Sequence, residues 1–268
     1  MRRIAVINQK GGVGKTTTAV NLAAAWADAG QSVCLLDLDP QAHASAHLGL
    51  IPNAERPSMY DVLVRGRRLQ EVRTNVLPGL DLVGSDLNLA GAEIELAGVV
   101  GREMILRDAL AADDHSAPTI VMDCAPSLGV LTLNALAAAT EVVIPLQPQY
   151  FALHGLERLL ETTAIVARRI NPALRVTAVV ACQYDGQVRL THEVLNEVVE
   201  FLERSRGRNL PWSEARLLNT RVRRNIRLAE CPSFGQTIFQ YAPKSNGAED
   251  YRALALEFAE QPALAAAA

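Results

Sequence analysis

The sequence predicts an α/β fold, with a single doubly wound, mostly parallel sheet flanked by helices and residues 1–268 forming one domain. Three observations lead to this prediction. Short apolar runs alternate along the chain with segments of helical periodicity, as in parallel α/β sheets. No linker or internal repeat divides the 268 residues, a length within the range of single α/β folds. A glycine-rich turn joins the first apolar run to the first helical segment.

The individual elements follow from apolar runs and helical periodicity. In the first half we expect helices at residues 18–29, 58–63, 87–96 and 104–112, with Ser85 capping the third of them and Asn88 three residues later. In the second half we expect helices at residues 131–139, 149–170 and 191–204. The expected strands are residues 4–7, 32–36, 80–84, 119–122, 141–146, 175–181 and 216–218.

The composition is that of a globular protein, with 49% hydrophobic and 21% charged residues. The net charge of −3 means that nucleic-acid binding requires a local basic patch. The widely spaced cysteines show no metal-ligand spacing, so we expect reduced, mostly buried thiols at Cys34, Cys124, Cys182 and Cys231. We find no signal peptide and no uninterrupted apolar run of 18 residues, so we expect a cytoplasmic protein without membrane attachment.

The glycine-rich turn has the composition of a phosphate-binding loop. Its glycines allow backbone N–H groups to converge on phosphate oxygens, and the following helix adds its positive dipole end. Lys15 is expected to reach the β- and γ-phosphates of ATP, and the Thr16 hydroxyl to ligate Mg²⁺. The common pattern G-x-x-x-x-G-K-S/T is not met, because Gln9 takes the first glycine position. The expected nucleotide-binding residues are Lys10, Gly11, Gly12, Val13, Gly14, Lys15, Thr16 and Thr17.

Three aspartates follow predicted strands. Asp37 and Asp39 come after residues 32–36, and Asp123 comes directly after residues 119–122. Ligands bind outside the carboxyl ends of strands in open α/β sheets, where the phosphate loop also lies. An aspartate at the end of a buried strand has the Walker B arrangement, so Asp123 is expected to hold Mg²⁺ directly or through water.

The loop resembles the deviant Walker A loop, K-G-G-x-G-K-S/T, of the ParA/MinD/nitrogenase-iron-protein ATPases. D-x-D-P-Q at residues 37–41, R-N-x-R-L-x-E-x-P-S-x-G at residues 224–235 and the segment 241–248 resemble ParA/Soj members in particular. The resemblance runs from residue 4 to about 260. It implies that Lys10 crosses a dimer interface to the partner's nucleotide and that Asp39 positions the attacking water. It also implies that Asp37 supports Mg²⁺ and the loop, and that Asn225 lies in the nucleotide pocket.

The resemblance implies an ATP-dependent DNA-segregation ATPase associated with the nucleoid. In such proteins Mg·ATP drives a nucleotide-sandwich homodimer, the dimer binds DNA non-specifically, and a ParB-like (Spo0J-like) activator stimulates the hydrolysis that releases it. The basic C-terminal segment supplies candidates for DNA contact. An alternative is that these charges are only solvated, or that Arg224 and Asn225 serve the pocket or the dimer edge. The candidate DNA-binding residues are Arg189, Arg221, Arg223, Arg224 and Arg227.

Three other members of the wider family are alternatives. A ParA-like positioner of another cargo remains open. A MinD-like membrane ATPase resembles its relatives in a basic amphipathic C-terminal helix, and this chain has no Lys or Arg after Arg252. A nitrogenase iron protein needs paired cysteine ligands, and Cys124 has no cysteine nearby. The chain departs from ParA relatives at Gln149 and His154, which replace two acids, and at Gln187, which replaces an arginine for which Arg189 is the candidate substitute.

Overall fold

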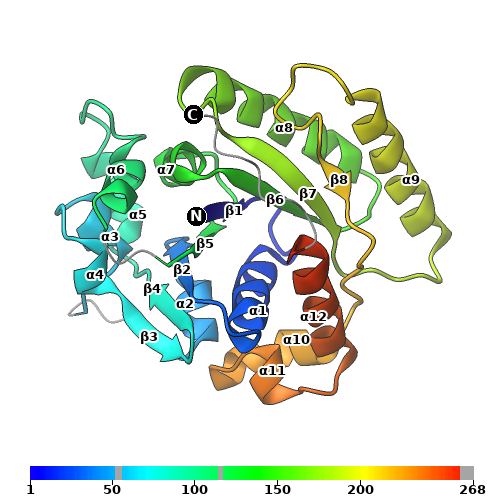
Figure 1. Ribbon diagram of the computed structural model, residues 1–268, viewed down its shortest axis with the longest axis horizontal. Helices are drawn as coiled ribbons and strands as arrows, with labels where there is room; N and C mark the ends of the chain where they lie inside the picture. The colour runs from blue at the N-terminus through cyan, green and yellow to red at the C-terminus, as the bar shows by residue number, and fades with distance from the viewer. Residues whose placement is uncertain (52–55, 114–116, 260–268) are drawn as a thin grey trace.

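An eight-stranded sheet forms the centre of the molecule in the computed structural model, which describes residues 1–51, 56–113 and 117–259 (Figure 1). The strands are β1 (Arg2–Val6), β2 (Val33–Leu38), β3 (Thr74–Leu77), β4 (Leu80–Val83), β5 (Thr119–Cys124), β6 (Glu141–Leu146), β7 (Arg175–Ala181) and β8 (Arg216–Leu217). Their order is β3-β4-β2-β5-β1-β6-β7-β8. In the described sheet only β3 and β4 pair antiparallel. The predicted doubly wound, mostly parallel sheet is therefore confirmed.

The helices cover both faces of this sheet. In β2, Cys34 and Leu36 point into one buried apolar cluster, and Val33 and Leu35 point into the other. Both faces of the strand are buried, as expected for a parallel sheet. The first cluster is covered by α3 (Met59–Leu63), α4 (Leu69–Val72), α5 (Leu89–Glu95), α6 (Ile105–Ala111), α7 (Val130–Ala138), α8 (Ala152–Arg169) and α9 (Arg189–Arg204). The second is covered by α1 (Lys15–Asp28), α2 (His43–His47), α10 (Ile226–Glu230), α11 (Ile238–Tyr241) and α12 (Asn246–Ala259).

The C-terminal helix α12 is part of the core. Figure 1 shows α12 beside α1, although the two helices lie at opposite ends of the sequence. The Phe258 ring packs edge-on against Trp26 with 6.0 Å between centroids, and the Trp26 indole N–H donates to the Ala255 carbonyl at 3.2 Å. Within the described part of the chain, no helix combines the length and apolarity that crossing a bilayer requires. Residues 260–268, on which part of the C-terminal sequence argument rests, lie outside the described residues.

The expected cap of α5 is wrong. Ser85 does not cap this helix, because the chain stays irregular for three further residues and the helix begins at Leu89. The Ser85 backbone N–H instead donates to the Ser45 hydroxyl at 2.9 Å, which ties the end of β4 to α2. Asp86 makes the local turn in its place, with its carboxylate accepting from the Asn88 N–H at 2.8 Å. The helix expected from residue 149 likewise begins later, at Ala152.

The short antiparallel strand β3 was not predicted. It joins β4 through a turn at Gly79, whose φ of +77° lies in the left-handed region. A Cβ there would lie 2.9 Å from the Gln31 carbonyl oxygen, and the Gly79 carbonyl accepts from the Val33 N–H at 2.8 Å. Glycine is required at this turn because the backbone approaches β2 so closely.

All four cysteines are buried and free, which confirms the expectation of reduced thiols. Burial raises the pKa of Cys34 and of Cys182 to about 12, because the thiolate would lose its hydration. These thiols are therefore neutral at physiological pH and behave as small core residues.

We predict that Phe258→Ala lowers the free energy of unfolding by about 3–5 kcal/mol, because it removes a fully buried ring from the α1–α12 contact. Urea unfolding followed by circular dichroism measures this loss. Leu256→Ala is the matched control, since Leu256 lies on the same helix and is 66% exposed. A loss of equal size in the two variants would contradict the role of α12 in the core.

Candidate functional site

The predicted site residues meet at the carboxyl edge of the sheet. β1 lies between β5 and β6, and Val6 pairs with Asp123 in the neighbouring strand. Asp37 pairs with Asp123 from the other side, so the two aspartates stand next to each other where their strands end. The connections that leave this point run to opposite faces, with α1 on one and α7 on the other. Such a point in a doubly wound sheet is where ligands bind.

The loop between β1 and α1 presents a row of unpaired N–H groups. No described residue accepts a hydrogen bond from the backbone N–H groups of residues 11–17, and the first helical bond runs from the Thr18 N–H to the Gly14 carbonyl at 2.9 Å. Gly12 and Gly14 have φ values of +73° and +99°, which side chains would disfavour. Backbone donors at the start of a helix form a concave site for anions, so the loop is built to bind phosphate.

The start of this loop is held by one residue near the end of β6 and one that follows it. The Asn8 amide donates to the Pro145 carbonyl at 2.7 Å, and its oxygen accepts from the Lys10 N–H at 2.9 Å. The exposed Lys10 ammonium donates to the Gln149 side-chain oxygen. Lys10 therefore lies at the entrance of the loop, and its ammonium is hydrogen-bonded to an uncharged side chain of its own chain.

Lys15 points into the loop and is almost fully buried, with 8% of the residue exposed. Its ammonium donates to the Lys10 carbonyl at 3.3 Å. Burial lowers the pKa of Lys15, and the nearby Asp123 and Asp39 carboxylates oppose this shift. The structure thus brings a buried cation and two of the predicted acids together beside the unpaired N–H groups.

Asp37 is fully buried and holds the segment that follows β2. Its carboxylate accepts from the Ser45 N–H at 2.8 Å, from the Ser45 hydroxyl at 2.7 Å and from the Asp39 N–H at 3.2 Å. Burial raises the pKa of Asp37 to about 6, although these hydrogen bonds lower it in part. Asp39 in turn accepts from the Gln41 N–H at 2.9 Å through one oxygen. Its other oxygen has no partner among the described residues.

Asp123 has no hydrogen-bond partner for either carboxylate oxygen among the described residues, although it is completely buried. Burial, followed by the charge of Asp37, raises its pKa well above the ordinary value. The Thr16 hydroxyl lies near enough to oppose this rise without reaching normal hydrogen-bond geometry, and Lys15 opposes it further. A buried carboxylate without a partner is costly. Oxygen ligands are those that Mg²⁺ prefers, so Asp123 and Thr16 fit a magnesium ion at this point.

A cavity of about 420 Å³ opens beside the phosphate loop. Gly14 and Thr17 form its wall on the loop side, and Cys182 and Gln183 line it at the end of β7. The predicted pocket residue Asn225 also lines it, and its side-chain oxygen accepts from the Arg227 N–H at 2.8 Å as the cap of α10. The cavity adjoins the phosphate site, which is the placement that the rest of a nucleotide needs.

Comparisons with known proteins agree with this geometry. A family model described as an AAA domain matches residues 1–176. The chromosome-partitioning ATPase Soj of Thermus thermophilus is 44% identical over 257 residues, which cover 96% of this chain and 95% of the relative. The chromosome partitioning protein ParA of Myxococcus xanthus is 42% identical over 257 residues, covering 96% of this chain and 87% of the relative. The chain belongs to the ParA/Soj family of partitioning ATPases.

A solved structure extends this comparison to bound ligands. The crystal structure of cobyrinic acid a,c-diamide synthase from Mycobacterium smegmatis, with a bound ATP analog and magnesium, has a TM-score of 0.79 and 34% identity. The similarity covers 95% of this chain and 93% of that chain. A protein that shares the ParA/Soj fold therefore holds nucleotide and magnesium together.

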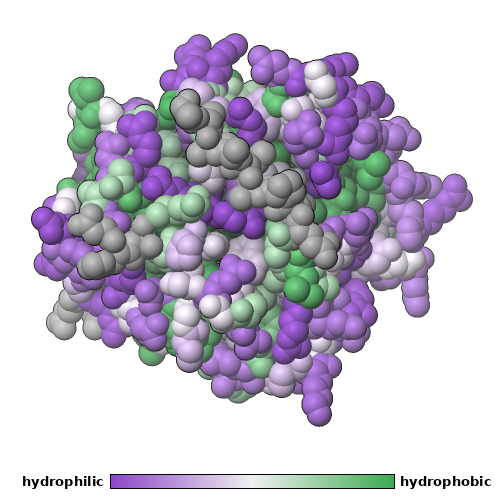
Figure 2. All heavy atoms as spheres, in the orientation of Figure 1, coloured by the Kyte–Doolittle hydropathy of each residue, from purple (hydrophilic) through white to green (hydrophobic). Residues whose placement is uncertain are grey.

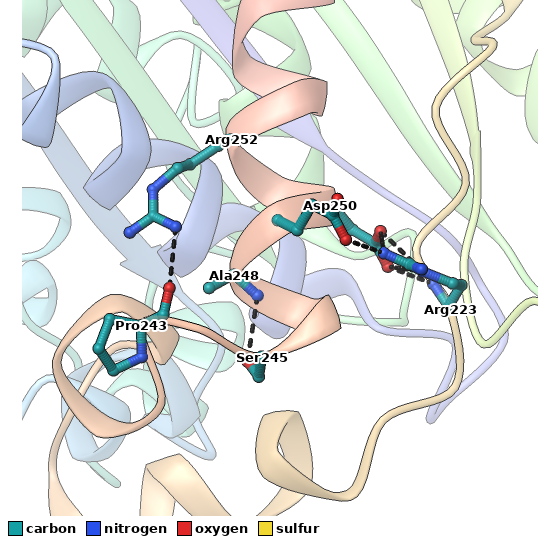
Figure 3. Close-up of polar contacts among 7 residues, drawn as sticks. Arg223, Pro243, Ser245, Ala248, Asp250 and Arg252 are labelled. Atoms are coloured by element: carbon teal, nitrogen blue, oxygen red, sulfur yellow. Dashed lines mark hydrogen bonds and ion pairs between the residues drawn. The ribbon is translucent and has the colours of Figure 1, made fainter.

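The candidate arginines of this ParA/Soj chain are largely engaged in ion pairs. Arg223 donates to Asp250 through two nitrogens, at 2.9 and 2.6 Å, and to Glu249 at 2.6 Å (Figure 3). These carboxylates raise the pKa of Arg223 further above its ordinary value. Arg227 pairs with Glu230 at 2.9 Å. Arg223 therefore ties the segment before α10 to α12, whereas the Arg227 pair is an exposed contact within one turn of the chain.

The other candidate arginines differ in burial and in whether a carboxylate pairs with their guanidinium group. Arg189 pairs with Glu193 at 2.7 Å on the exposed first turn of α9. Arg221 is half-buried, burial lowers its pKa, and its Nη1 has no partner among the described residues. Arg224 is exposed, and no described carboxylate pairs with it. It also lines the cavity beside the loop together with Asn225, which agrees with the alternative that these two residues serve the pocket. In the same view as Figure 1, Figure 2 shows hydrophilic side chains over much of the rim of the molecule.

The residues that depart from ParA relatives also have defined places. His154 is an exposed residue on the first turn of α8, with its ring nitrogen 3.4 Å from the Glu157 carboxylate. The Gln187 backbone N–H donates to the Asp185 carboxylate in the turn before α9. Gln149 contacts Lys10, as described above.

Two site residues were missed from the sequence. Ser45 holds the buried Asp37 carboxylate, and Gln183 donates to the Gly12 carbonyl of the phosphate loop at 2.5 Å. The signal for Gln183 was its position two residues after β7, at the same carboxyl edge as the loop. Ser45 had no comparable signal, because it lies in an irregular segment of the sequence.

We predict that Asp123→Asn raises the melting temperature of the protein free of nucleotide and magnesium, because it removes an unpaired buried charge. Burial raises the folded-state pKa of Asp123, so ionisation costs stability as the pH rises above the unfolded pKa of about 4. The gain is therefore larger at pH 8 than at pH 5, on the scale of about 1–3 kcal/mol. Differential scanning calorimetry in EDTA measures it.

Asp28→Asn is the matched control, since Asp28 is an exposed aspartate at the end of α1. It should leave the melting temperature unchanged at both pH values. A lower melting temperature for Asp123→Asn at pH 8 would contradict this view of the site.

Proposed function

We propose that this ParA/Soj chain is an ATP-dependent DNA-segregation ATPase. Mg·ATP drives a nucleotide-sandwich homodimer, the dimer binds DNA non-specifically, and hydrolysis stimulated by a ParB-like activator releases it. One observation carries the proposal: unpaired N–H groups at residues 11–17 face a site where Asp123 is buried without a partner among the described residues. An anion site and a cation site side by side are what Mg·ATP requires. The two relatives reported above are named as chromosome-partitioning proteins, which supports the cellular role.

The residues of the site divide the work of ATP hydrolysis. The N–H groups of the loop and the Lys15 ammonium bind and orient the phosphates. Thr16 and Asp123 would hold Mg²⁺, which supplies charge neutralisation at the phosphate oxygens when bound. Asp39 is fixed by the Gln41 N–H through one oxygen and offers the other to orient the attacking water. Asp37 keeps this segment in place through Ser45.

Lys10 is the residue that we assign to the partner subunit's nucleotide. Lys15 already supplies a cation to the phosphates of its own chain, whereas Lys10 is exposed at the mouth of the loop. A neutral amide oxygen binds an ammonium less strongly than a carboxylate does. Gln149 therefore holds Lys10 in the free subunit without competing strongly against phosphates of a second copy, where Lys10 would add charge stabilisation.

DNA binding is assigned first to Arg224, which is exposed and not paired with a described carboxylate. Arg221 is half-buried and its unpaired Nη1 is not accessible, so it is the weaker candidate. Arg189 is also available, because an exposed ion pair such as that with Glu193 is worth only about 0–1 kcal/mol. The Arg227 pair with Glu230 is of the same exposed kind, so Arg227 also stays a candidate. Arg223 would have to break its contacts with the buried Asp250, which hold the C-terminal segment. A single patch of this size binds weakly, so we propose that the ATP dimer supplies two patches on one face.

Two alternatives make different demands on the chain. A MinD-like membrane role needs an amphipathic C-terminal helix free to lie on a bilayer. In α12 the apolar residues Tyr251, Leu254 and Phe258 are buried against the rest of the fold, which disfavours that role. A ParA-like positioner of another cargo would share every step up to DNA binding and differ in its activating partner.

We predict slow Mg²⁺-dependent ATP hydrolysis, below about 1 s⁻¹ without an activator. Lys15→Ala should abolish nucleotide binding or hydrolysis, because it removes the buried cation. Asp39→Ala should bind nucleotide and lose hydrolysis. Phosphate release and the fluorescence of a labelled ATP measure the two properties, with Asp28→Ala as an exposed control. Hydrolysis by Asp39→Ala at the wild-type rate would show that another residue orients the water.

We predict ATP-dependent DNA binding by the Asp39→Ala protein, which cannot turn its nucleotide over. Fluorescence anisotropy should give equal affinities on two unrelated duplexes, because arginine contacts to phosphate carry no sequence information. Affinity should fall steeply as the salt concentration rises. In a plot of log affinity against log salt concentration, Arg224→Glu should reduce the slope by about 0.9 for each phosphate that the arginine no longer neutralises. Arg168→Glu, which changes an exposed arginine on α8, is the matched control.

The same protein tests the role of Lys10. Adding Lys10→Ala should remove both the ATP-dependent dimer, seen by size-exclusion chromatography, and the DNA binding that depends on it. Equal DNA binding with ADP would reject the proposed coupling between nucleotide and DNA. A dimer that survives Lys10→Ala would reject the contact of Lys10 with the partner's phosphates.

A further inference from the structure

Gln183 has an unusual backbone conformation. Its φ of +51° lies in the left-handed region, which it shares with only one other non-glycine residue of the described chain, Ala42. Side chains disfavour this region, so such a residue persists only where its surroundings fix it, and functional sites are where such residues gather. Ala42 follows the Asp39 segment and Gln183 lines the cavity beside the loop, so both flank the nucleotide site.

The Gln183 side chain reaches back to the phosphate loop and is braced there. Its amide nitrogen donates to the Gly12 carbonyl at 2.5 Å, and its amide oxygen accepts from the Gln147 side-chain nitrogen at 2.8 Å. A flipped Gln183 amide would set its oxygen against the Gly12 oxygen, so the two contacts are compatible with one orientation. Gln147, which follows β6, supports that orientation from the side away from the loop.

The hydrogen bond to the Gly12 carbonyl also sets the direction of the neighbouring Val13 N–H. In a planar trans peptide the carbonyl of Gly12 and the N–H of Val13 point in opposite directions. Holding the Gly12 oxygen toward Gln183 therefore turns the Val13 N–H away from Gln183. This N–H is one of the unpaired donors of the loop. Gly12 has no side chain to resist rotation of this peptide, so without Gln183 the donor is free to turn away from a phosphate.

We propose that Gln183 is a positioning residue for the nucleotide phosphates, which fixes the Val13 N–H in its donating direction with Gln147 as its brace. This inference rests on the proposed ATP site. Gln183 and its contacts are solvent-exposed, and an exposed neutral hydrogen bond adds little to folding stability. Its effect therefore belongs to nucleotide affinity rather than to the stability of the fold.

The test measures the dissociation constants of fluorescent ATP and ADP for full-length variants, together with melting temperatures. Gln183→Met keeps the length of the side chain and removes the donor. It should weaken both nucleotides by about three- to tenfold, the equivalent of one neutral hydrogen bond, and shift the melting temperature by less than about 2 °C. Gln187→Met is the matched control, since only its backbone makes a described hydrogen bond. It should change neither quantity.

A double-mutant cycle of Gln183 and Gln147, measured as nucleotide affinity, distinguishes a positioning role of Gln183 from a local packing effect. Gln147→Met should weaken binding less than Gln183→Met, because it removes only the brace. Adding it to Gln183→Met should cause no further loss, since the brace acts through Gln183. Additive losses, unchanged affinity in Gln183→Met, or affinity that falls only in step with the melting temperature would overturn the inference. A wild-type protein that binds neither nucleotide would instead overturn the proposed function.

Discussion

The structure depends on polar groups that the fold leaves unpaired at one edge of the sheet. Among the described residues, the N–H groups of residues 11–17 lack acceptors and the buried Asp123 carboxylate lacks donors. They do not hydrogen-bond to one another, and they suit opposite charges, since the N–H groups favour an anion and the carboxylate favours a cation. The unliganded protein bears the cost of the buried Asp123 carboxylate, so a ligand that meets both needs would bind the folded state and stabilise it. The rest of the fold keeps these groups from collapsing onto each other.

Packing around this edge joins segments that are distant in sequence. Ser45 on α2 holds Asp37, and two residues later on the same helix His47 lies 3.4 Å from the Cys231 sulfur in the 3₁₀ helix 231–234. Burial lowers the pKa of His47 to about 4, so this contact is between neutral groups at physiological pH. The acidic segment after β2 and the arginine segment before residue 231 therefore form one packed unit, although 184 positions separate His47 from Cys231.

The sequence predicts those parts of the site that depend on strand ends and spacing. Apolar runs located β6 and β7 at their observed bounds, and the positions of Asp37 and Asp123 after such runs placed them at one edge. It could not predict contacts that depend on where a side chain turns in three dimensions. Gln183 contacts a loop residue 171 positions away in the sequence. Asp86, and not Ser85, forms the turn before α5, because the Ser85 backbone is bonded to Ser45 on α2. Arginine-rich composition likewise could not show which charges are already paired.

The proposed DNA binding of this acidic protein depends on which arginines are free of ion pairs. A charge that holds the fold is not at the same time available to a ligand, because the ion pair must break before the arginine can neutralise a phosphate. Arg223 is committed to Asp250 and Glu249, which fixes the segment that lines the nucleotide cavity (Figure 3). Arg224, the next residue, is held by the same backbone but exposes its charge. Both arginines line the cavity, but the Arg223 guanidinium is held in ion pairs, whereas no described carboxylate pairs with that of Arg224. Since each subunit retains few arginines without an ion pair here, the proposed DNA binding requires two subunits acting together.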